Sequence, residues 1–273
     1  TYTKVPVDVR QTSDIDFNGT ALVPISNTHI RSYDGGGFTI EKYAITVADG
    51  DDAIVAAGLF STFYGTYLQD IHIINPSITV TKASVPVGAL CGQINVKGAI
   101  SDIHTADSNS TIQIVNCDAH YKNVTDNGYS TYADAPKLSG QYTVGGLVGA
   151  IADRESGSLT VSVTGSYASL VLAMTNLSDS FTGGLIGLSA GDKLSIDTSY
   201  ADNYMSGRCI GGLVGALVED GNCTITNSYS AGFVYGTEVE VSQVGGLVGH
   251  IGEENESLAM EYTRSEERRV GKE

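Results

Sequence analysis

The sequence predicts an all-β protein, a parallel β-helix-like solenoid of stacked repeats of about 30 residues each. Three observations predict it. The pentapeptide Gly-Gly-Leu-Val-Gly recurs through the second half of the chain, each copy is followed by a strand-like segment ending in Ser-Tyr, and glycine makes up 33 of 273 residues without a collagen period. Because a unit this small cannot bury its strands alone, burial requires a neighbouring repeat.

The pentapeptide begins at Gly145 and recurs from Gly183, Gly211 and Gly245, with Ile in place of Val in the second copy. Its leucines, at positions 147, 185, 213 and 247, are 38, 28 and 34 residues apart, a spacing typical of repeat architectures. Glycine at fixed positions indicates either positive φ or close approach to the adjacent repeat. We therefore interpret the motif as a stacking device.

The segment after each pentapeptide alternates with period two and is expected to be a strand. In residues 224–229, this alternation puts Ile225, Asn227 and Tyr229 on one face. The tyrosines at the end of the four segments are Tyr167, Tyr200, Tyr229 and, in a weaker copy, Tyr262. They should form a ladder, and the face they share with Ile225 favours packing inside over an outward position where they could stack on sugars.

Degenerate copies occur upstream, at residues 57–60 and 88–92, so we expect one solenoid domain over residues 1–262. Its expected parts are degenerate N-terminal coils over 1–140, an inserted loop near 121–142 and the stronger repeats over 141–262. Insertions into repeat arrays often carry function. Residues 263–273 are expected to be a non-repeat tail; the run from Arg264 resembles translated linker sequence and is left out of the functional reasoning.

These repeats resemble the GLUG family, named for its Gly-Leu-small-Gly core, in all four strong copies. Residues 12–17 (TSDIDF) are similar to the ADIDL strand that precedes such repeats, and residues 33–40 (YDGGGFTI) to its FDGNGHTI hairpin, although Gly36 stands where the family usually has Asn. The resemblance covers roughly residues 12–262. The resemblance implies a β-helix-like stack in a larger bacterial surface or secreted protein. Some proteins of this family are associated with immunoglobulin-A-type peptidases. The resemblance implies no catalytic residues.

The formal charge of −16 repels phosphate backbones and anionic lipid, so we expect no nucleic-acid partner. No apolar run approaches the length of a membrane helix, so no membrane insertion is expected. The first four residues lack the apolar core of a signal peptide. We expect the chain to continue into other domains of a larger protein that carries the signal and anchor.

The cysteines Cys91, Cys117, Cys209 and Cys223 show no CxxC pair or metal-ligand spacing. By alignment of the repeats, Cys91 occupies the position of Val148, and Cys117 that of Ser228, which suits small core residues. A disulfide between Cys209 and Cys223 is a hypothesis that the sequence leaves open.

Candidates for chemistry are few. The acidic clusters at 49–52 (DGDD) and at Glu253, Glu254 and Glu256 could supply paired carboxylates for glycoside hydrolysis, and the first could bind calcium, but both read more simply as solvated turns. The histidines, which show neither HxH nor HExxH spacing, are His29, His72, His104, His120 and His250. We therefore expect no catalytic, cofactor-binding or metal-binding residues.

The function these features favour is a non-enzymatic structural or adhesion module, extracellular or on a bacterial cell surface. It would project or space other domains and bind a host protein or glycan, above all through the loop near 121–142. Two alternatives stay open: a polysaccharide-degrading β-helix enzyme and a calcium-stabilised scaffold.

Overall fold

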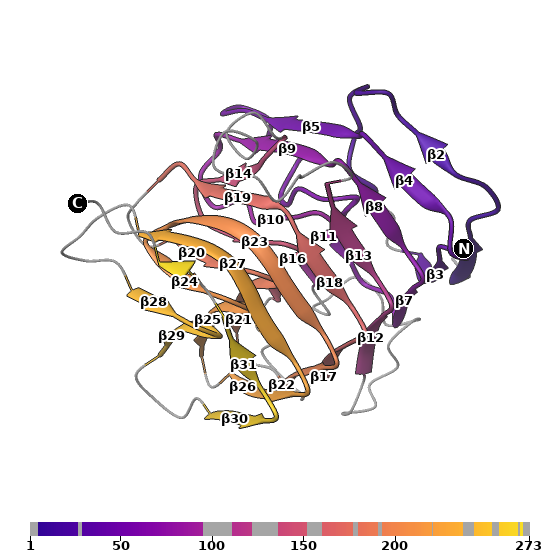
Figure 1. The fold of residues 1–273 in the computed structure, drawn as a ribbon. Coiled ribbons are helices and arrows are strands. Elements are labelled where there is room, and N and C mark those ends of the chain that lie inside the picture. Colours follow the sequence, from indigo (N-terminus) through magenta and orange to yellow (C-terminus); the bar gives the residue numbers. More distant parts are fainter. Residues whose placement is uncertain are drawn as a thin grey trace.

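The fold is known from a computed structural model, which describes residues 5–26, 29–94, 111–121, 136–151, 160–176, 180–190, 193–219, 221–236, 243–252, 257–266 and 268–269. These residues form β-strands and no helix, arranged in four sheets (Figure 1). Every strand pairing among them is parallel, as between β17 and β22 or β20 and β24. The expectation of an all-β chain is confirmed. The described residues contain no helix that could span a membrane.

The first sheet has the strand order β1 (Val7–Arg10), β3 (Ile30–Asp34), β7 (Tyr67–Gln69), β12 (Thr111–Val115), β17 (Thr160–Thr164), β22 (Lys193–Asp197), β26 (Asn222–Thr226) and β30 (Ser257–Glu261). The second sheet follows β2 (Ile15–Asp16), β4 (Thr39–Glu41), β8 (His72–Ile74), β13 (Asp118–His120), β18 (Tyr167–Ser169), β23 (Tyr200–Gly207), β19 (Val171–Met174), β14 (Leu138–Gly140), β9 (Ser77–Val80) and β5 (Ala44–Val47). Beside β23 it continues with β27 (Tyr229–Gly236), β31 (Arg264–Ser265) and β32 (Arg268–Arg269).

The third sheet consists of β10 (Val87–Gly88), β15 (Thr143–Gly145), β20 (Phe181–Gly183), β24 (Cys209–Gly211) and β28 (Gln243–Gly245). The fourth consists of β6 (Phe60–Phe63), β11 (Cys91–Ile94), β16 (Val148–Ile151), β21 (Ile186–Ala190), β25 (Val214–Val218) and β29 (Val248–Ile251).

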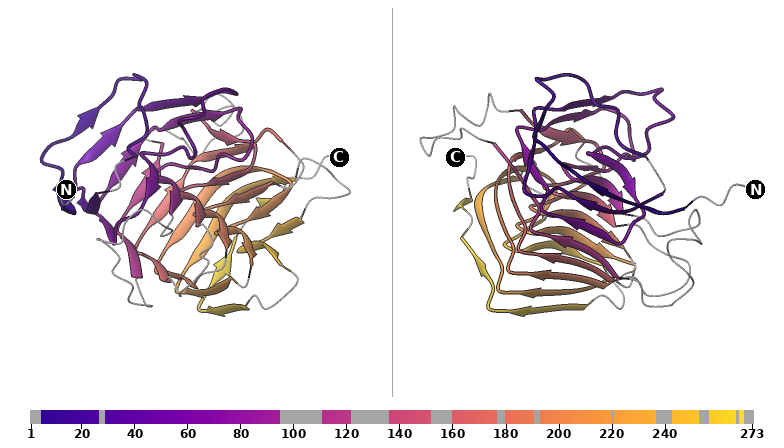
Figure 2. Two further views of the ribbon diagram at one scale, coloured as in Figure 1. Left: turned by 180° about the vertical axis from the view of Figure 1, so that it is seen from behind. Right: turned by 90° about the vertical axis from the view of Figure 1, so that its right-hand side faces the viewer.

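The chain visits the four sheets in a fixed order. From β17 it passes to the second sheet with β18 and β19, to the third with β20, to the fourth with β21, and returns to the first with β22. Each strand therefore lies beside the corresponding strand of the next repeat, and the colours in Figure 2 run from indigo at one end of the sheets to yellow at the other. The repeat inferred from the pentapeptide is thus the unit of strand pairing.

The core lies between the sheets and is built from columns of equivalent residues. Ile114, Val163, Ile196 and Ile225 are direct neighbours on β12, β17, β22 and β26, and all four are fully buried. Burying each such side chain stabilises the fold by roughly 1.5–3 kcal/mol relative to leaving it exposed. A repeat contributes one member to each column, so burial depends on the repeats at its two sides.

The pentapeptide forms the turn from the third sheet to the fourth, which we call the glycine corner. A Cβ on Gly183 would lie 1.8 Å from the Ile186 carbonyl oxygen, and one on Gly184 would lie 1.8 Å from the Gly212 carbonyl oxygen and 2.6 Å from the Ala201 Cβ. No pentapeptide glycine has positive φ. Of the two roles expected for these glycines, the structure shows close backbone approach.

The turn from the first sheet to the second, which we call the serine corner, is built differently. Equivalent residues there adopt left-handed φ: Asn116 (52°), Gly165 (60°), Thr198 (50°), Asn227 (48°) and Tyr262 (52°). The next residue is a buried serine in three repeats. The N–H of Ser166 donates to the Ser199 hydroxyl and that of Ser199 to the Ser228 hydroxyl, each at 3.1 Å. Each hydroxyl donates in turn to the carbonyl two residues back, at 3.0, 2.8 and 2.6 Å.

The cysteines are free and buried. Cys91 pairs with Val148, and the Cys117 N–H donates to the Ser166 hydroxyl at 3.1 Å, as the serines do among themselves; both predicted positions are confirmed. Cys209, in β24, and Cys223, in β26, are both free, which contradicts the hypothesis of a disulfide between them.

The C-terminal tail departs from expectation. Arg264 and Ser265 pair with Tyr229 and Ser230, and Arg268 and Arg269 pair with Phe233 and Val234. The second sheet therefore extends past residue 262. Of the loop expected near 121–142, residues 122–135 lie outside the described residues.

Candidate binding surface

The tyrosines of the Ser-Tyr motif lie on the outside of the second sheet, contrary to the expectation that they pack in the core. Ile225 is buried and Asn227 makes the left-handed turn, after which Ser228 is buried and Tyr229 is 37% exposed. The serine corner shifts the alternation by one residue, because β26 ends at Thr226 and β27 begins at Tyr229. A single strand through both segments would have kept Tyr229 beside Ile225.

Tyr262 is not part of the ladder. Glu261 pairs with Thr226 and Arg264 pairs with Tyr229, so Tyr262 occupies the corner position of Asn227 and is 80% exposed. The alignment of the weakest repeat was therefore wrong by two residues, and Arg264 continues the tyrosine column.

Three tyrosines form a regular stack across the strands. The ring centroids of Tyr167 and Tyr200 are 4.8 Å apart and those of Tyr200 and Tyr229 are 5.0 Å apart, with interplanar angles of 1° in both pairs. Stacked rings cover one another's faces, so they present their edges and hydroxyl groups to solvent. The strands that carry the stack, β18, β23 and β27, lie side by side on the side of the molecule that is turned to the viewer in Figure 1.

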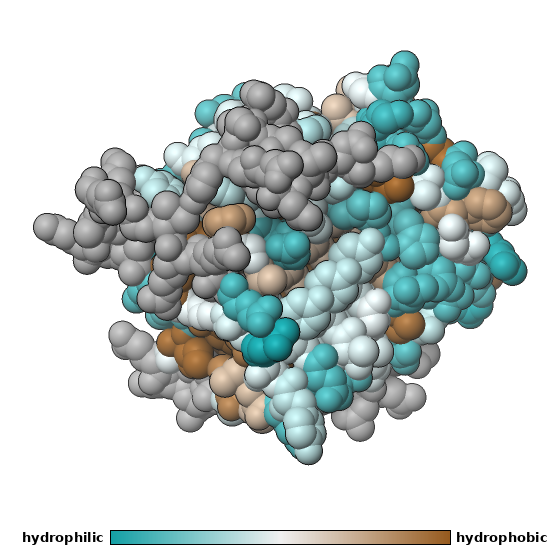
Figure 3. All heavy atoms as spheres, in the orientation of Figure 1, coloured by the Kyte–Doolittle hydropathy of each residue, from teal (hydrophilic) through white to brown (hydrophobic). Residues whose placement is uncertain are grey.

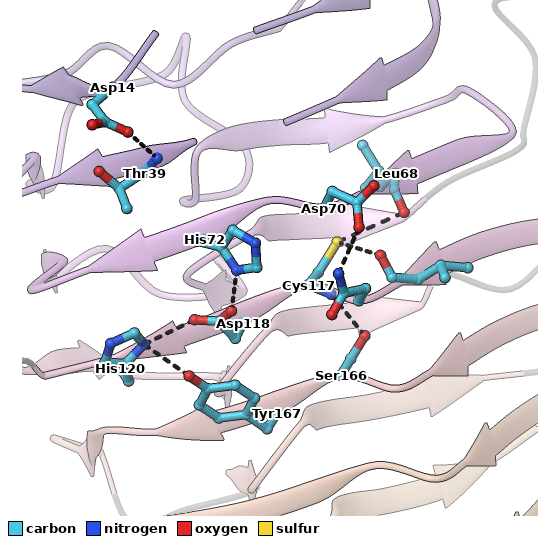
Figure 4. Close-up of polar contacts among 12 residues, drawn as sticks. Asp14, Thr39, Leu68, Asp70, His72, Cys117, Asp118, His120, Ser166 and Tyr167 are labelled. Atoms are coloured by element: carbon cyan, nitrogen blue, oxygen red, sulfur yellow. Dashed lines mark hydrogen bonds and ion pairs between the residues drawn. The ribbon is translucent and has the colours of Figure 1, made fainter. Parts of the chain in front are cut away.

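Two histidines and one carboxylate extend the stack toward the N-terminus (Figure 4). Asp118 pairs with His72 on one side and Tyr167 on the other, so it stands in the tyrosine column. Its Oδ2 lies 2.8 Å from the His120 Nδ1, its Oδ1 contacts the His72 Nδ1, and the Tyr167 hydroxyl lies 3.3 Å from the His120 Nδ1. The two carboxylate contacts are hydrogen bonds in the imidazole tautomers that carry a proton on Nδ1.

A second aromatic row runs parallel to the first. Tyr204 on β23 pairs with Phe233 on β27, and their ring centroids are 6.4 Å apart. Between the two rows lie the outward-facing residues Ser169, Asp202 and Ala231. We call this strip of small and polar residues between the aromatic rows the lane. In Figure 3 the centre of this face is pale to teal, hence neutral to hydrophilic.

The electrostatics of this face favour neutral phenols. Partial burial, with the nearby Asp118 carboxylate, raises the pKa of Tyr167. Partial burial also raises the pKa of Tyr200, with added effects of Tyr229 and Asp118. The hydroxyl groups of the stack are therefore donors as well as acceptors over the physiological pH range.

The other residues considered from the sequence are dispersed. Asp51 accepts from the Ala48 N–H at 2.9 Å, and Lys82 Nζ lies 3.5 Å from Asp52 Oδ1, so the 49–52 cluster is a turn with an ammonium beside it. His250 contacts Gln243 at 2.8 Å. His29 lies just before β3 of the first sheet. His104 and the Glu253–Glu256 cluster lie outside the described residues, which include no group of three His, Cys, Asp or Glu placed to bind a metal.

A pocket of about 300 Å³ lies where the outer faces of the third and fourth sheets meet. Its walls include Tyr142, Phe181 and Leu188, and Glu219 is the acidic residue among the described residues that line it. Burial and the neighbouring Glu219 raise the pKa of Tyr142.

No family model matches the chain, and no curated protein matches it. Among solved structures, a Bacteroides ovatus protein named "putative immunoglobulin A1 protease" is similar, with a TM-score of 0.62 and 18% sequence identity over 97% of this chain and 78% of the other. At this identity the likeness shows a common fold.

Proposed function

We propose that this chain is a non-enzymatic structural and adhesion module: a parallel β-solenoid of GLUG-type repeats that belongs to a larger bacterial surface or secreted protein and binds a host glycan or protein. The binding surface is the outer face of β13, β18, β23 and β27. One observation carries the proposal. The aromatic side chains on this face point outward in two rows, on strands fixed by pairing on both sides.

The position of these rings supports recognition over core packing. Aromatic side chains with one apolar and one hydrogen-bonding end are enriched at interfaces, because they contribute contact area at little cost in conformational entropy. The stack of Tyr167, Tyr200 and Tyr229 has this character and needs no further packing partner to be ordered. A site on strands is also held more rigidly than a site on loops.

The enzyme alternative has less support. Asp118 contacts two imidazoles, as the carboxylate of a catalytic triad contacts and orients its histidine base. The hydroxyl group next to it belongs to Tyr167, whose pKa is raised, and a raised pKa disfavours the ionised, nucleophilic form. The calcium-scaffold alternative is not favoured either, because Lys82 lies at the 49–52 turn.

The test combines binding and turnover measurements on the full chain. A glycan array that also carries immunoglobulin A1 as a protein probe should show saturable binding, and incubation with polysaccharides should release no new reducing ends. Asp118→Ala serves as the variant for the turnover assay. Release of reducing ends by the wild type that is lost in this variant would establish the enzyme alternative and end this proposal.

A further inference from the structure

We infer that the ligand of this face is a linear, uncharged glycan that lies in the lane and crosses the strands with one sugar unit per repeat. The inference rests on the proposed function, because it specifies the ligand of the same surface. Four features carry it: the shape of the lane, its hydrogen-bonding groups, its period and its charge.

The lane has aromatic walls and a floor of short side chains. On β23, Tyr200 and Tyr204 stand on either side of Asp202; on β27, Tyr229 and Phe233 stand on either side of Ala231. Because outward residues alternate along a strand, β23 and β27 each present wall, floor and wall in turn. Next to β18, where the floor is Ser169, the second wall position is Val171 of β19, and on β13 the floor position is His120. The result is a trough that runs perpendicular to the strands and has aromatic side chains on both sides at β23 and β27.

The groups along the lane match the surface of a sugar. Tyrosine hydroxyls both donate and accept hydrogen bonds, and the exposed carboxylate of Asp202 accepts them. Sugar hydroxyls do both, and the C–H groups of a pyranose ring can pack against aromatic carbon. A polypeptide strand would instead need unpaired backbone groups at a sheet edge, and the strands beneath the lane are paired on both sides.

The regular spacing of the stacked rings favours a polymeric ligand. Ring centroids are 4.8 and 5.0 Å apart, the spacing of neighbouring strands. An extended β-linked pyranose chain advances by a similar length at each sugar, so each sugar can lie beside one tyrosine. Tyr167, Tyr200 and Tyr229, on β18, β23 and β27, provide three such positions.

The net charge of the chain disfavours acidic polysaccharides. On this face Asp202 is exposed, whereas Asp118 is 4% exposed and lies beside two imidazoles. At the C-terminal end of the face, Arg264 is paired with Glu266 at 3.2 Å and Arg268 pairs with Phe233 along the strands. The chain as a whole carries −16. Sulfated and uronic-acid chains would be repelled, whereas uncharged chains would not.

The experiment measures affinity against ligand length by calorimetry with the full chain. The probes are β-1,4-linked oligomers of glucose, mannose and N-acetylglucosamine, from monomer to hexamer, with polygalacturonate and heparin as polyanions. For at least one uncharged series, affinity should rise with each unit up to the trimer and then level off. Affinity that is independent of length, tighter binding of a polyanion, or no binding of any uncharged series would overturn the inference.

Variants locate the ligand. Tyr200→Ala should weaken binding about threefold to tenfold, and Ala231→Gln should weaken it by filling the floor of the lane without removing a contact. The matched control is Tyr67→Ala, which removes an outward-facing tyrosine from the first sheet. Equal effects of Tyr67→Ala and Tyr200→Ala would place the ligand elsewhere.

These outcomes separate the two proposals. A protein or branched glycan whose binding is lost in Ala231→Gln would keep the proposed adhesion function and end the inference of a linear glycan. If neither the array nor the oligomers bind, the proposed function itself fails.

Discussion

The two corners of each repeat turn the chain by different physical means. At the glycine corner, side chains are absent because backbone from the same repeat and the next one fills their space; at the serine corner, side chains are present and bond the backbone of the neighbouring repeat. The first corner is therefore a steric constraint and the second a hydrogen-bonded one. Both recur in the sequence, but they should respond differently to substitution.

The comparison also shows where function can lie. The glycine corner faces inward, with Leu147, Leu185 and Leu213 fully buried and joined by N–H to carbonyl bonds of 3.0 and 2.8 Å. It has no side chain available for a ligand. The serine corner points the residue that follows it outward, and the tyrosine column begins there. Recurrence alone thus does not separate a structural position from a binding position.

The largest effect is expected from Gly183→Ala at the glycine corner. The new Cβ would lie 1.8 Å from the Ile186 carbonyl oxygen and 2.5 Å from the Gly215 nitrogen, both of them backbone atoms. Two repeats would have to separate to accept it, so we expect a loss of about 3 kcal/mol or more in the free energy of unfolding. Urea denaturation followed by circular dichroism measures it.

The matched control is Gly165→Asn at the serine corner. Gly165 has φ of 60° and open space around it, and the equivalent Asn116 and Asn227 show that asparagine accepts this conformation. The change should stay within about 1 kcal/mol. If the two glycine substitutions cost the same, the contrast between the corners is wrong.

A smaller loss is expected from Ser199→Ala. The Ser166 N–H would lose its acceptor in a buried site, and the Asp197 carbonyl would keep only the Gly165 N–H, at 3.2 Å, of its two donors. We expect a loss of about 1–3 kcal/mol. Ser199→Cys should retain part of the stability, because Cys117 already occupies this position and bonds the Val115 carbonyl at 3.4 Å. A cysteine variant no more stable than the alanine variant would show that the column does not act through hydrogen bonds.

The sequence predicted the repeat unit, the parallel all-β class and the places of Cys91 and Cys117, because these follow from periodic burial and need only local spacing. It did not predict which way Tyr229 points, because a left-handed residue at Asn227 resets the alternation without changing the hydrophobic pattern. The Asp118 cluster was missed for another reason: His72 and Asp118 are 46 residues apart. The sequence did contain a signal for the position of Asp118. The tyrosine follows the serine directly in each repeat, so aligning Cys117 with the serines aligns Asp118 with the tyrosines.

A modest gain in stability is expected from Tyr262→Asn, which tests the corrected alignment of the last repeat. Tyr262 has φ of 52° and is 80% exposed, so the bulky side chain sits in a left-handed corner without packing to offset the strain. Asparagine, as at the equivalent Asn227, should raise the free energy of unfolding by about 0.5–1 kcal/mol. A loss instead would indicate that Tyr262 packs as a member of the ladder.

The smallest effect is expected for the reaction of the native protein with a thiol reagent. This reaction tests both corners, because each has a buried cysteine in or next to it. Cys117 stands in the serine column and Cys91 next to the glycine corner, and burial raises the pKa of both thiols, that of Cys117 to about 12. At pH 9 about one Cys117 thiol in a thousand would be ionised, and the thiolate is the reactive form. Ellman's reagent should therefore find almost no reactive thiol in the folded chain and all 4 in urea.

The variant Cys117→Ser identifies the contribution of the Cys117 thiol. It should keep the fold, because serine fills the same position in the next repeat, and it should lower by one the number of thiols that react in urea. Fast native labelling that disappears in this variant would mean that the serine corner opens far more readily than its hydrogen bonds imply.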